Sequence, residues 1–272
     1  MKVEFWGVRG SCPVSGEDKI KYGGHTLCAS VTLSEEESLI IDAGTGIRKL
    51  GEKLLKEGEE KPLTLHLFLT HFHLDHIMGI PFFKPLYSPQ AVLTFYAPAQ
   101  PEETEKYLST IMAGRFYPVD FKETSSRKIF KEAPEKDFSV GEIQVSSCPL
   151  HHPQGSIAYK IKAGKVSIVF ATDTEHPEEG VDRRLVEFAE GADVLIYDAM
   201  FTPEEYKAGK QGWGHSTWLA GTKLARAAGA KTLYLSHFNF AHVDSQIDEI
   251  LSLAQKEFPR TKAARERLVV DF

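Results

Sequence analysis

The chain has 272 residues, of which 42% are hydrophobic and 26% are charged, a composition typical of a folded globular protein. A net charge of −6 and the lack of a basic tract in the sequence weigh against tight binding of long nucleic acids. No apolar run reaches the length of a membrane span, and the first residues, Met1–Trp6, do not read as an export signal. Three widely spaced cysteines predict reduced, buried thiols, so we expect a cytoplasmic protein.

The N-terminal part alternates short apolar runs with glycine-rich loops. Strands are predicted at Lys2–Trp6, Leu27–Leu33 and Ser38–Ile41. A helix is predicted at Ile47–Glu57, because its apolar residues recur at helical spacing. The first loop contains Arg9, a candidate phosphate contact at the mouth of a pocket, and His25, whose role stays open.

The next apolar run, Leu63–Leu69, leads into the segment Thr70–His76, which holds three of the 11 histidines together with Asp75. Residues two apart in an extended chain point the same way, so His71 and His73 can bind one ion. Asp75 and His76 lie where the strand must turn, and they can face a second ion. Imidazole and carboxylate ligands suit zinc first, and also manganese or iron. The sequence therefore predicts a metal site here.

The middle of the chain carries less information. The aromatic, proline-broken segment Ile80–Tyr87 is either a lip of the pocket or a subunit contact. A strand is predicted at Ala91–Tyr96 and a helix at Pro101–Met112, which begins with proline and acidic residues. Residues 113–139 are interpreted as an irregular, charged surface segment.

In the second half, polar residues follow one apolar run after another. Strands are predicted at Glu142–Cys148, Tyr159–Lys162, Val166–Phe170, Ala192–Tyr197 and Lys231–Leu235. Helices are predicted at Asp182–Ala189, Thr217–Ala228 and Ser245–Glu257. Because α/β sheets present ligands at strand ends, the residues that follow these runs are candidate ligands, namely His151, His152, Asp173, Asp198 and His237. No linker divides the chain, so we predict one domain over residues 1–272.

Several other polar residues have weaker assignments. Asp42 and Asp198 follow strands and either orient ligand imidazoles or cap their loops, and both interpretations stay open. His66 is interpreted as structural, and His176 and His242 are expected to face solvent.

The pattern His-x-His-x-Asp-His at His71, His73, Asp75 and His76 resembles the metallo-β-lactamase superfamily, and the order of the later residues resembles it too. The resemblance implies an α/β fold, a four-layer αββα sandwich of two packed sheets with helices outside. It also implies two divalent ions. The ligands are then His71, His73 and His152 at the first ion, Asp75, His76 and His237 at the second, and Asp173 between them.

Two further segments resemble the ribonuclease Z and cyclic phosphodiesterase branch of that superfamily. In one, His152 precedes Tyr159 by seven positions, and the other is Gly214–Thr217. His215 in the latter is a candidate proton donor to a leaving oxygen, or it only flanks the helix cap that follows. Ribonuclease Z carries a long tRNA-binding arm between the elements matched by His152 and Asp173. The short stretch 153–172 has no room for such an arm, which argues against tRNA processing.

The function predicted from these residues is a dinuclear metal-dependent hydrolase that attacks through a metal-bridging hydroxide, with Asp75 and His215 as catalytic residues. The net positive charge of such a centre favours a small anionic substrate, most of all a small or cyclic phosphodiester. Hydrolysis of a carboxylic ester, lactone or thioester is one alternative, and a non-catalytic metal-binding sensor is another. Homodimers are common in the superfamily, and Phe82 and Phe83 could supply the contact.

Overall fold

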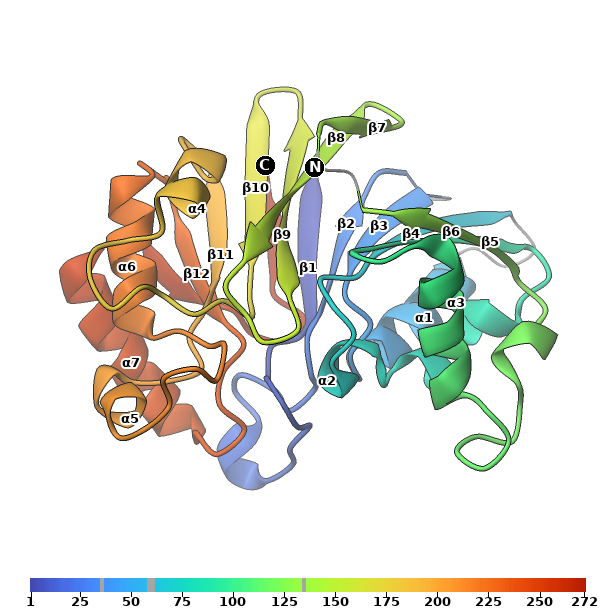
Figure 1. Ribbon diagram of the computed structural model, residues 1–272, viewed down its shortest axis with the longest axis horizontal. Coiled ribbons are helices and arrows are strands. Elements are labelled where there is room, and N and C mark those ends of the chain that lie inside the picture. Colours follow the sequence, from blue (N-terminus) through green and yellow to red (C-terminus); the bar gives the residue numbers. More distant parts are fainter. Residues whose placement is uncertain (35–36, 58–61, 134–135) are drawn as a thin grey trace.

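The structure, a computed structural model, describes residues 1–34, 37–57, 62–133 and 136–272. Two seven-stranded sheets face each other, and helices cover their outer sides (Figure 1). The four-layer αββα sandwich predicted from the sequence is confirmed. Strand β1 pairs with β14 near the other end of the chain, so both ends belong to one sheet. That the chain is a single domain stays a prediction.

The first sheet has the strand order β14-β1-β2-β3-β4-β5-β6. Its strands are β1 (Lys2–Gly7), β2 (Cys28–Thr32), β3 (Glu37–Ile41), β4 (Leu63–Phe68), β5 (Ala91–Ala97), β6 (Arg127–Glu132) and β14 (Val269–Asp271). Strands β3, β4, β5 and β6 run parallel. Parallel neighbours end at the same edge of a sheet, so the residues after β3 and β4 lie close together.

The second sheet has the strand order β13-β12-β11-β10-β9-β8-β7. Its strands are β7 (Phe138–Val140), β8 (Ile143–Leu150), β9 (Ser156–Ala163), β10 (Val166–Ala171), β11 (Val194–Asp198), β12 (Leu233–Ser236) and β13 (Thr261–Ala263). The hairpin of β9 and β10 turns at Gly164, as predicted. Strands β10, β11, β12 and β13 are parallel, which gathers their carboxyl ends at one edge.

Helices cover the two outer faces of the sandwich. The α-helices are α1 (Ile47–Glu57), α2 (Leu74–Ile77), α3 (Pro101–Ile111), α4 (Arg183–Phe188), α5 (Pro203–Lys207), α6 (Trp218–Ala227) and α7 (Asp244–Glu257), and the 3-10 turns are η1 (Glu17–Lys19), η2 (Ile80–Phe82), η3 (Lys84–Tyr87) and η4 (Phe121–Glu123). Helices α1 and α3 contact the first sheet, and α4, α6 and α7 contact the second. None of the helices in the described residues is long and apolar enough to cross a membrane.

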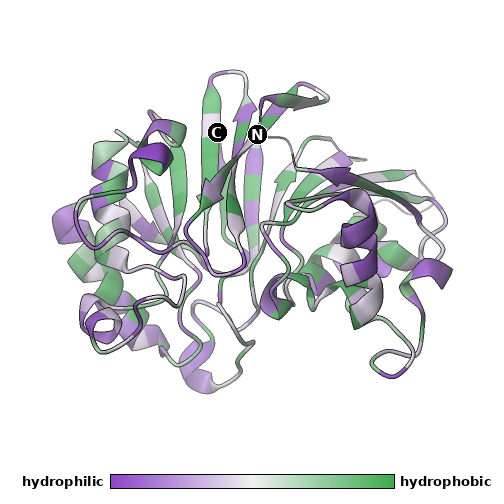
Figure 2. Ribbon diagram, in the orientation of Figure 1, coloured by the Kyte–Doolittle hydropathy of each residue, from purple (hydrophilic) through white to green (hydrophobic). Residues whose placement is uncertain are grey.

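Alternation along the strands explains the layers. In β3, Leu39 and Ile41 point into the cluster between the sheets, whereas Ile40 points to the cluster under α1 and α3. Successive side chains of a strand face opposite sides, so a strand covered on both faces is apolar throughout. Figure 2 shows this as mostly apolar strands beside helices that carry both apolar and polar residues.

Three predictions about the fold need correction. Residues 113–139, of which 134–135 lie outside the described residues, contain β6 and β7 rather than only irregular chain. In Ile80–Tyr87, Phe83 is buried and packs against α1, so it belongs to the core and cannot form a lip. Phe82 and Lys84 are exposed, and a subunit contact through this segment stays a prediction. Cys12 is exposed, unlike Cys28 and Cys148. Strand β13, which pairs with β12, and strand β14, which pairs with β1, were not predicted.

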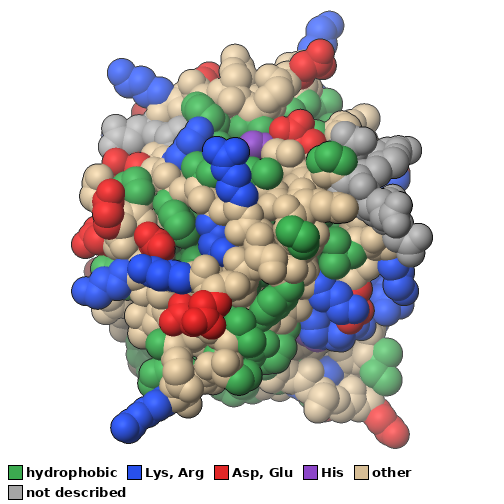
Figure 3. Space-filling model, turned by 90° about the vertical axis from the view of Figure 1, so that its right-hand side faces the viewer, with side chains coloured by type: hydrophobic (Ala, Val, Ile, Leu, Met, Phe, Trp, Pro, Cys, Tyr) green, Lys and Arg blue, Asp and Glu red, His purple; other side chains and the backbone are tan. Residues whose placement is uncertain are grey.

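Charges are mixed on the face that lies beside β5 and β6. Figure 3 shows lysine and arginine side chains interspersed there with acidic and apolar ones, and neither sign dominates. The mixture agrees with a chain of net charge −6.

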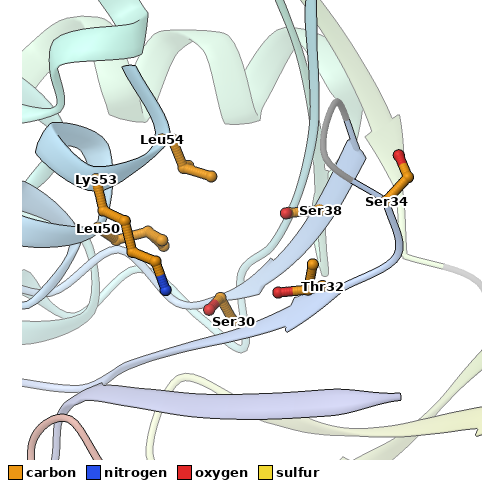
Figure 4. A pocket seen from close by; sticks show the side chains of 7 residues that line it. All are labelled: Ser30, Thr32, Ser34, Ser38, Leu50, Lys53 and Leu54. Atoms are coloured by element: carbon orange, nitrogen blue, oxygen red, sulfur yellow. The ribbon is translucent and has the colours of Figure 1, made fainter. Parts of the chain in front are cut away.

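A cavity of about 350 Å³ lies between α1 and the strands β2 and β3 (Figure 4). Ser30, Thr32 and Ser38 line it together with Lys53, whose ammonium group lies 2.7 Å from Glu4 Oε2. Lys53 is the one cation among the lining residues that the structure describes, and it is already paired with Glu4. None of its lining residues belongs to the predicted metal site.

Candidate metal centre

The predicted ligands come together from both sheets. The loop after β4 supplies His71, His73, Asp75 and His76, and the second sheet supplies His152, Asp173 and His237. Within these residues three groups have ligand atoms that lie within 4.8 Å of one another. The groups are His71, His73 and His152; His71, His76 and Asp173; and Asp75, His76 and His237.

Unusual backbone conformations aim several of these side chains. Three of the polar residues that follow strands have a positive φ angle. These are Asp42 directly after β3 (57°), Asp173 two residues after β10 (58°) and His237 directly after β12 (58°). Residues other than glycine rarely adopt this left-handed backbone conformation, and those that do cluster at functional sites. The sharp turn that results points each side chain back across the strand ends.

The first group is built around three imidazoles. His73 Nδ1 lies 3.1 Å from His152 Nε2, and the ring of His71 lies 4.5 Å from that of His73 and 4.9 Å from that of His152. His71 Nε2 is also 3.8 Å from Asp173 Oδ1, so this carboxylate closes the group on its inner side. Three nitrogens and one oxygen form a donor set that suits zinc.

The second group shares Asp173 with the first. Asp173 Oδ2 lies 3.1 Å from His76 Nε2 and 3.3 Å from His237 Nε2. Asp75 Oδ2 lies 3.4 Å and 3.5 Å from the same two nitrogens and accepts a hydrogen bond of 2.7 Å from the backbone N–H of Ser11. Because Asp173 presents one oxygen to each group, its carboxylate could bridge two ions.

Four of the five imidazoles are held by a hydrogen bond through their other ring nitrogen, whereas His237 Nδ1 makes none to the described residues. His71 Nδ1 contacts Thr70 Oγ1 at 3.0 Å, His76 Nδ1 contacts Asp42 at 2.8 Å, and His152 Nδ1 contacts the carbonyl oxygen of Gly214 at 2.8 Å. His73 Nε2 contacts Gln154 Oε1 at 3.1 Å, and His237 Nδ1 lies 3.5 Å from Asp198 Oδ2. Such partners fix the tautomer and the ring orientation of metal-binding histidines.

Asp42 and Asp198 contact the candidate ligands, which favours the orienting interpretation over simple loop capping. Asp42 accepts hydrogen bonds from the Thr70 backbone and hydroxyl, so it steadies His71 through Thr70 and His76 directly. Asp198 accepts backbone hydrogen bonds that include one from Asp173. Its two oxygens are therefore occupied, although it lies in a further possible ligand group with Asp173, His215 and His237.

The buried carboxylates of the centre require positive charge close to them. Burial alone would raise the pKa of Asp75, but His76 and the hydrogen bonds from His237 bring it well below its usual range. Burial likewise opposes the charged form of His237, yet Asp173 and Asp198 raise its pKa to about 10. Buried carboxylates stay ionised only where cations are close. Divalent ions are one such source of positive charge.

Two buried atoms that lack a hydrogen bond test whether metal ions fit the site. His71 Nε2 and Asp173 Oδ2 are buried and make no hydrogen bond to the described residues. A buried polar atom without a partner is costly, and a metal ion is one of the few partners that would serve both a nitrogen and a carboxylate oxygen here. The residues present therefore fit a pair of divalent ions.

His215 lies beside the groups, as predicted. Its Nδ1 is 3.1 Å from Asp198 Oδ2, and its ring stacks on that of His237 at 5.2 Å and lies 5.4 Å from that of His152. The neighbouring Thr217 caps α6 by accepting the Ala220 N–H. His215 Nε2 makes no hydrogen bond within the described part of the chain, so the cap and a role in proton transfer are compatible.

Several weaker assignments need correction. Arg9 is fully buried and donates to the carbonyl oxygens of Gly23, Asn239 and His242, so it cannot contact a phosphate at the pocket mouth. His242 is buried too, and its Nε2 lies 2.8 Å from Glu205, because the loop after β12 folds inward.

Three other histidines are held by neighbouring side chains. His176 is half-buried, with Nδ1 2.9 Å from Ser216 Oγ, so it does not face solvent freely as predicted. His25 Nδ1 contacts Thr45 Oγ1 at 3.1 Å, which makes it part of the loop structure. His66 pairs with Glu37 at 2.9 Å, in agreement with a structural role.

Sequence reasoning missed two supporting residues. Gln154 holds His73 and has a left-handed backbone, with φ of 63°. Glu175 accepts hydrogen bonds from the backbone N–H groups of Gly212 and Gly214 and from the Tyr206 hydroxyl, and so fixes the loop before His215. Gln154 lies within the segment from His152 to Tyr159, but that segment was used only for its histidine and tyrosine. The only signal of Glu175 is its closeness in sequence to Asp173.

Comparison with known proteins agrees with this architecture. Residues 38–238 match the family model described as a beta-lactamase superfamily domain. Ribonuclease Z of Lactiplantibacillus plantarum is 25% identical over 314 aligned positions, which cover 100% of this chain and 98% of that relative.

Solved structures show the same fold. The metallo-β-lactamase fold protein YhfI from Bacillus subtilis matches with a TM-score of 0.74 and 22% identity, over 99% of this chain and 98% of that one. A diphosphatase from the PhnP family matches with a TM-score of 0.69 and 19% identity, over 100% and 97%. The chain therefore belongs to the beta-lactamase superfamily, and the predicted class, a metal-dependent hydrolase of the metallo-β-lactamase fold, is confirmed.

Proposed function

We propose that the chain is a dinuclear metal-dependent phosphodiesterase that acts on a small or cyclic phosphodiester. The observation that carries this proposal is the common arrangement of His71, His73, His76, His152 and His237. The rings of His71, His73, His76 and His152 each have one nitrogen hydrogen-bonded to a protein partner and the other within a candidate ligand group. The ring of His237 has Nε2 in such a group and Nδ1 3.5 Å from Asp198 Oδ2. Such preorganisation is characteristic of metal sites and is not needed for a merely structural histidine cluster.

In this proposal His71, His73, His152 and Asp173 hold one ion, and Asp75, His76, His237 and Asp173 hold the other. Two divalent ions, zinc first and manganese or iron as alternatives, would polarise the phosphoryl group and lower the pKa of the attacking water. Their charge outweighs that of the two carboxylates, so an anionic phosphodiester is favoured over a neutral substrate.

Two residues of the chain then assist the attack of water and the departure of the leaving oxygen. The reaction adds water to phosphorus and breaks one ester P–O bond, which gives a phosphomonoester and a hydroxyl group. That hydroxyl group leaves as an alcohol from an open-chain diester and stays on the same molecule when a cyclic diester is opened. Asp75, held by Ser11, can accept a hydrogen bond from the attacking water. His215, held at Nδ1 by Asp198, is placed to give a proton from Nε2 to the departing oxygen.

The similarity to ribonuclease Z makes RNA the second candidate substrate. Against it, residues 153–172 form the start of the β9–β10 hairpin and its two strands, with no inserted arm. The alignment with the Lactiplantibacillus plantarum relative runs over 314 positions, more than the 272 residues of this chain, so the relative has segments that this chain lacks. Both observations support a small substrate.

A substrate panel tests the proposal. The purified chain is loaded with zinc, manganese or iron, and its turnover of bis-p-nitrophenyl phosphate and cyclic nucleotides is compared with that of lactones, thioesters and a tRNA precursor. We expect about two ions per chain and the highest kcat/KM for a small phosphodiester. A preference for lactones or thioesters would overturn the phosphodiester assignment, precise cleavage of the tRNA precursor would overturn the small-substrate assignment, and bound metal without hydrolysis would indicate a sensor.

Two broader predictions accompany this function. A cytoplasmic location is supported by three free cysteines, which are typical of reducing compartments. Homodimer formation stays a prediction, for which exposed Phe82 remains an available contact.

A further inference from the structure

A pocket of about 560 Å³ opens beside the candidate metal centre. His71 and His73 line its inner end, and the same two imidazoles belong to the first ligand group. A substrate held at that group would therefore have one of its substituents next to the pocket. Its volume lies in the range of pockets that enclose small organic ligands.

The walls of the pocket are mostly apolar and include two aromatic rings. Phe72, between the two histidines, meets Tyr107 of α3 edge to face, with ring centroids 4.9 Å apart. Tyr107 is nevertheless 40% exposed, so part of its ring remains open to a ligand. The other apolar lining residues are Pro98, Ala99, Pro149, Leu150 and Ile157.

Polar groups occur at only a few places in the pocket. Ser156 is buried and its Oγ has no hydrogen-bond partner within the described residues. Gln154, held in a left-handed conformation, and exposed Glu103 complete the polar lining apart from the histidines. The lining residues of the described chain include no lysine or arginine, so a second phosphate group would meet a carboxylate and no cation.

From this geometry we propose that the pocket binds a flat, uncharged aromatic ring carried by one ester group of the phosphodiester. The inference rests on the proposed function, since it places the phosphate at the metal centre. An aromatic ring fits better than an alkyl chain because it can stack on the open part of Tyr107 against the Phe72 edge. The edge of a heteroaromatic ring can also form a hydrogen bond with the Gln154 side chain, which an alkyl group cannot do.

Binding measurements test the pocket without depending on turnover. The metal-loaded protein is titrated calorimetrically with inorganic phosphate, cyclohexyl phosphate and phenyl phosphate, and then with ribose 5-phosphate and a nucleoside 5′-monophosphate. Aromatic stacking of this kind typically changes affinity by roughly 5-fold to 150-fold. We expect a gain in that range for phenyl over cyclohexyl phosphate and for the nucleotide over ribose 5-phosphate.

Variants of Tyr107 test whether this ring causes the preference for aromatic ligands. Tyr107→Phe should keep the preference for the aromatic ligands, whereas Tyr107→Leu and Tyr107→Ala should lose it without changing affinity for inorganic phosphate. Phe116→Ala is the matched control, because Phe116 is 78% exposed and does not line the pocket. Equal affinity for phenyl and cyclohexyl phosphate, or an equal loss for all ligands in Tyr107→Ala, would overturn the proposal.

The two proposals can fail separately. Hydrolysis of small phosphodiesters without any aromatic preference would leave the proposed function standing and remove the pocket assignment. An aromatic preference in binding that depends on Tyr107, combined with no phosphodiester hydrolysis, would keep the pocket and remove the proposed function.

Discussion

His215 differs from the five clustered histidines in the freedom of its ring. Its Nδ1 contacts Asp198, but its Nε2 belongs to none of the three groups formed by the predicted ligands. We therefore expect His215→Ala to keep its bound metal and to lose roughly 100-fold to 10,000-fold in kcat, the usual contribution of a general acid. Metal analysis and the pH dependence of kcat check this, since a missing acid removes the alkaline decline. A variant with normal turnover would return His215 to the role of a flanking residue.

Gly10 is a second single residue on which the centre depends. A Cβ atom there would lie 2.4 Å from His237 Cε1 and 2.4 Å from the Met200 methyl group. We expect Gly10→Ala to displace the His237 ring and to weaken metal binding, measured as ions per chain after dialysis against a weak chelator. Gly114→Ala is the control, because nothing lies within 4 Å of the added Cβ. Equal metal retention in both variants would contradict the expected clash between the added Cβ atom and the His237 ring.

At the scale of elements, strand β9 ties the two sheets together directly behind the ligand loop. The buried hydroxyl of Tyr159 donates to the carbonyl oxygen of Leu69, and the Ile157 N–H donates to that of Thr70. Tyr159→Phe leaves the Leu69 oxygen buried without a partner, so we expect a loss of about 1 to 3 kcal/mol in the free energy of unfolding.

Urea denaturation measures this loss. Tyr234→Phe serves as the reference, because Tyr234 is equally buried and its hydroxyl makes no hydrogen bond to the described residues. If the two variants were equally stable, the inter-sheet hydrogen bond would contribute nothing measurable.

The same scale separates what the sequence could predict from what it could not. The helix at Ile47–Glu57 and the ligand-bearing strand ends were predictable because apolar periodicity and polar residues coincide there. Strand β6 was missed because its charged residues suit an exposed sheet edge as well as a loop. Buried Arg9 and His242 were misjudged because their partners are backbone carbonyls and a distant carboxylate, which no local pattern records.

At the scale of the whole molecule, the proposed ions would join the two halves of the sandwich. Four candidate ligands follow β4 of the first sheet and three belong to the second, so bound metal would act as a cross-link between the sheets. We expect chelation to lower the melting temperature and to speed amide exchange in the loops after β4, β10 and β12. Free metal at 100 times its Kd would raise the free energy of unfolding by about 2.7 kcal/mol relative to the metal-free protein.

Asp173→Asn is the informative variant for this cross-link, since Asp173 presents one oxygen to each group. Its melting temperature should respond little to chelator or added metal, whereas the response of Gly114→Ala should equal that of the unmodified protein. A chelator effect of the same size in Asp173→Asn would mean that metal stabilises the protein elsewhere. The seven side chains at the strand ends would then have to be explained as a polar cluster held together by its own ion pairs.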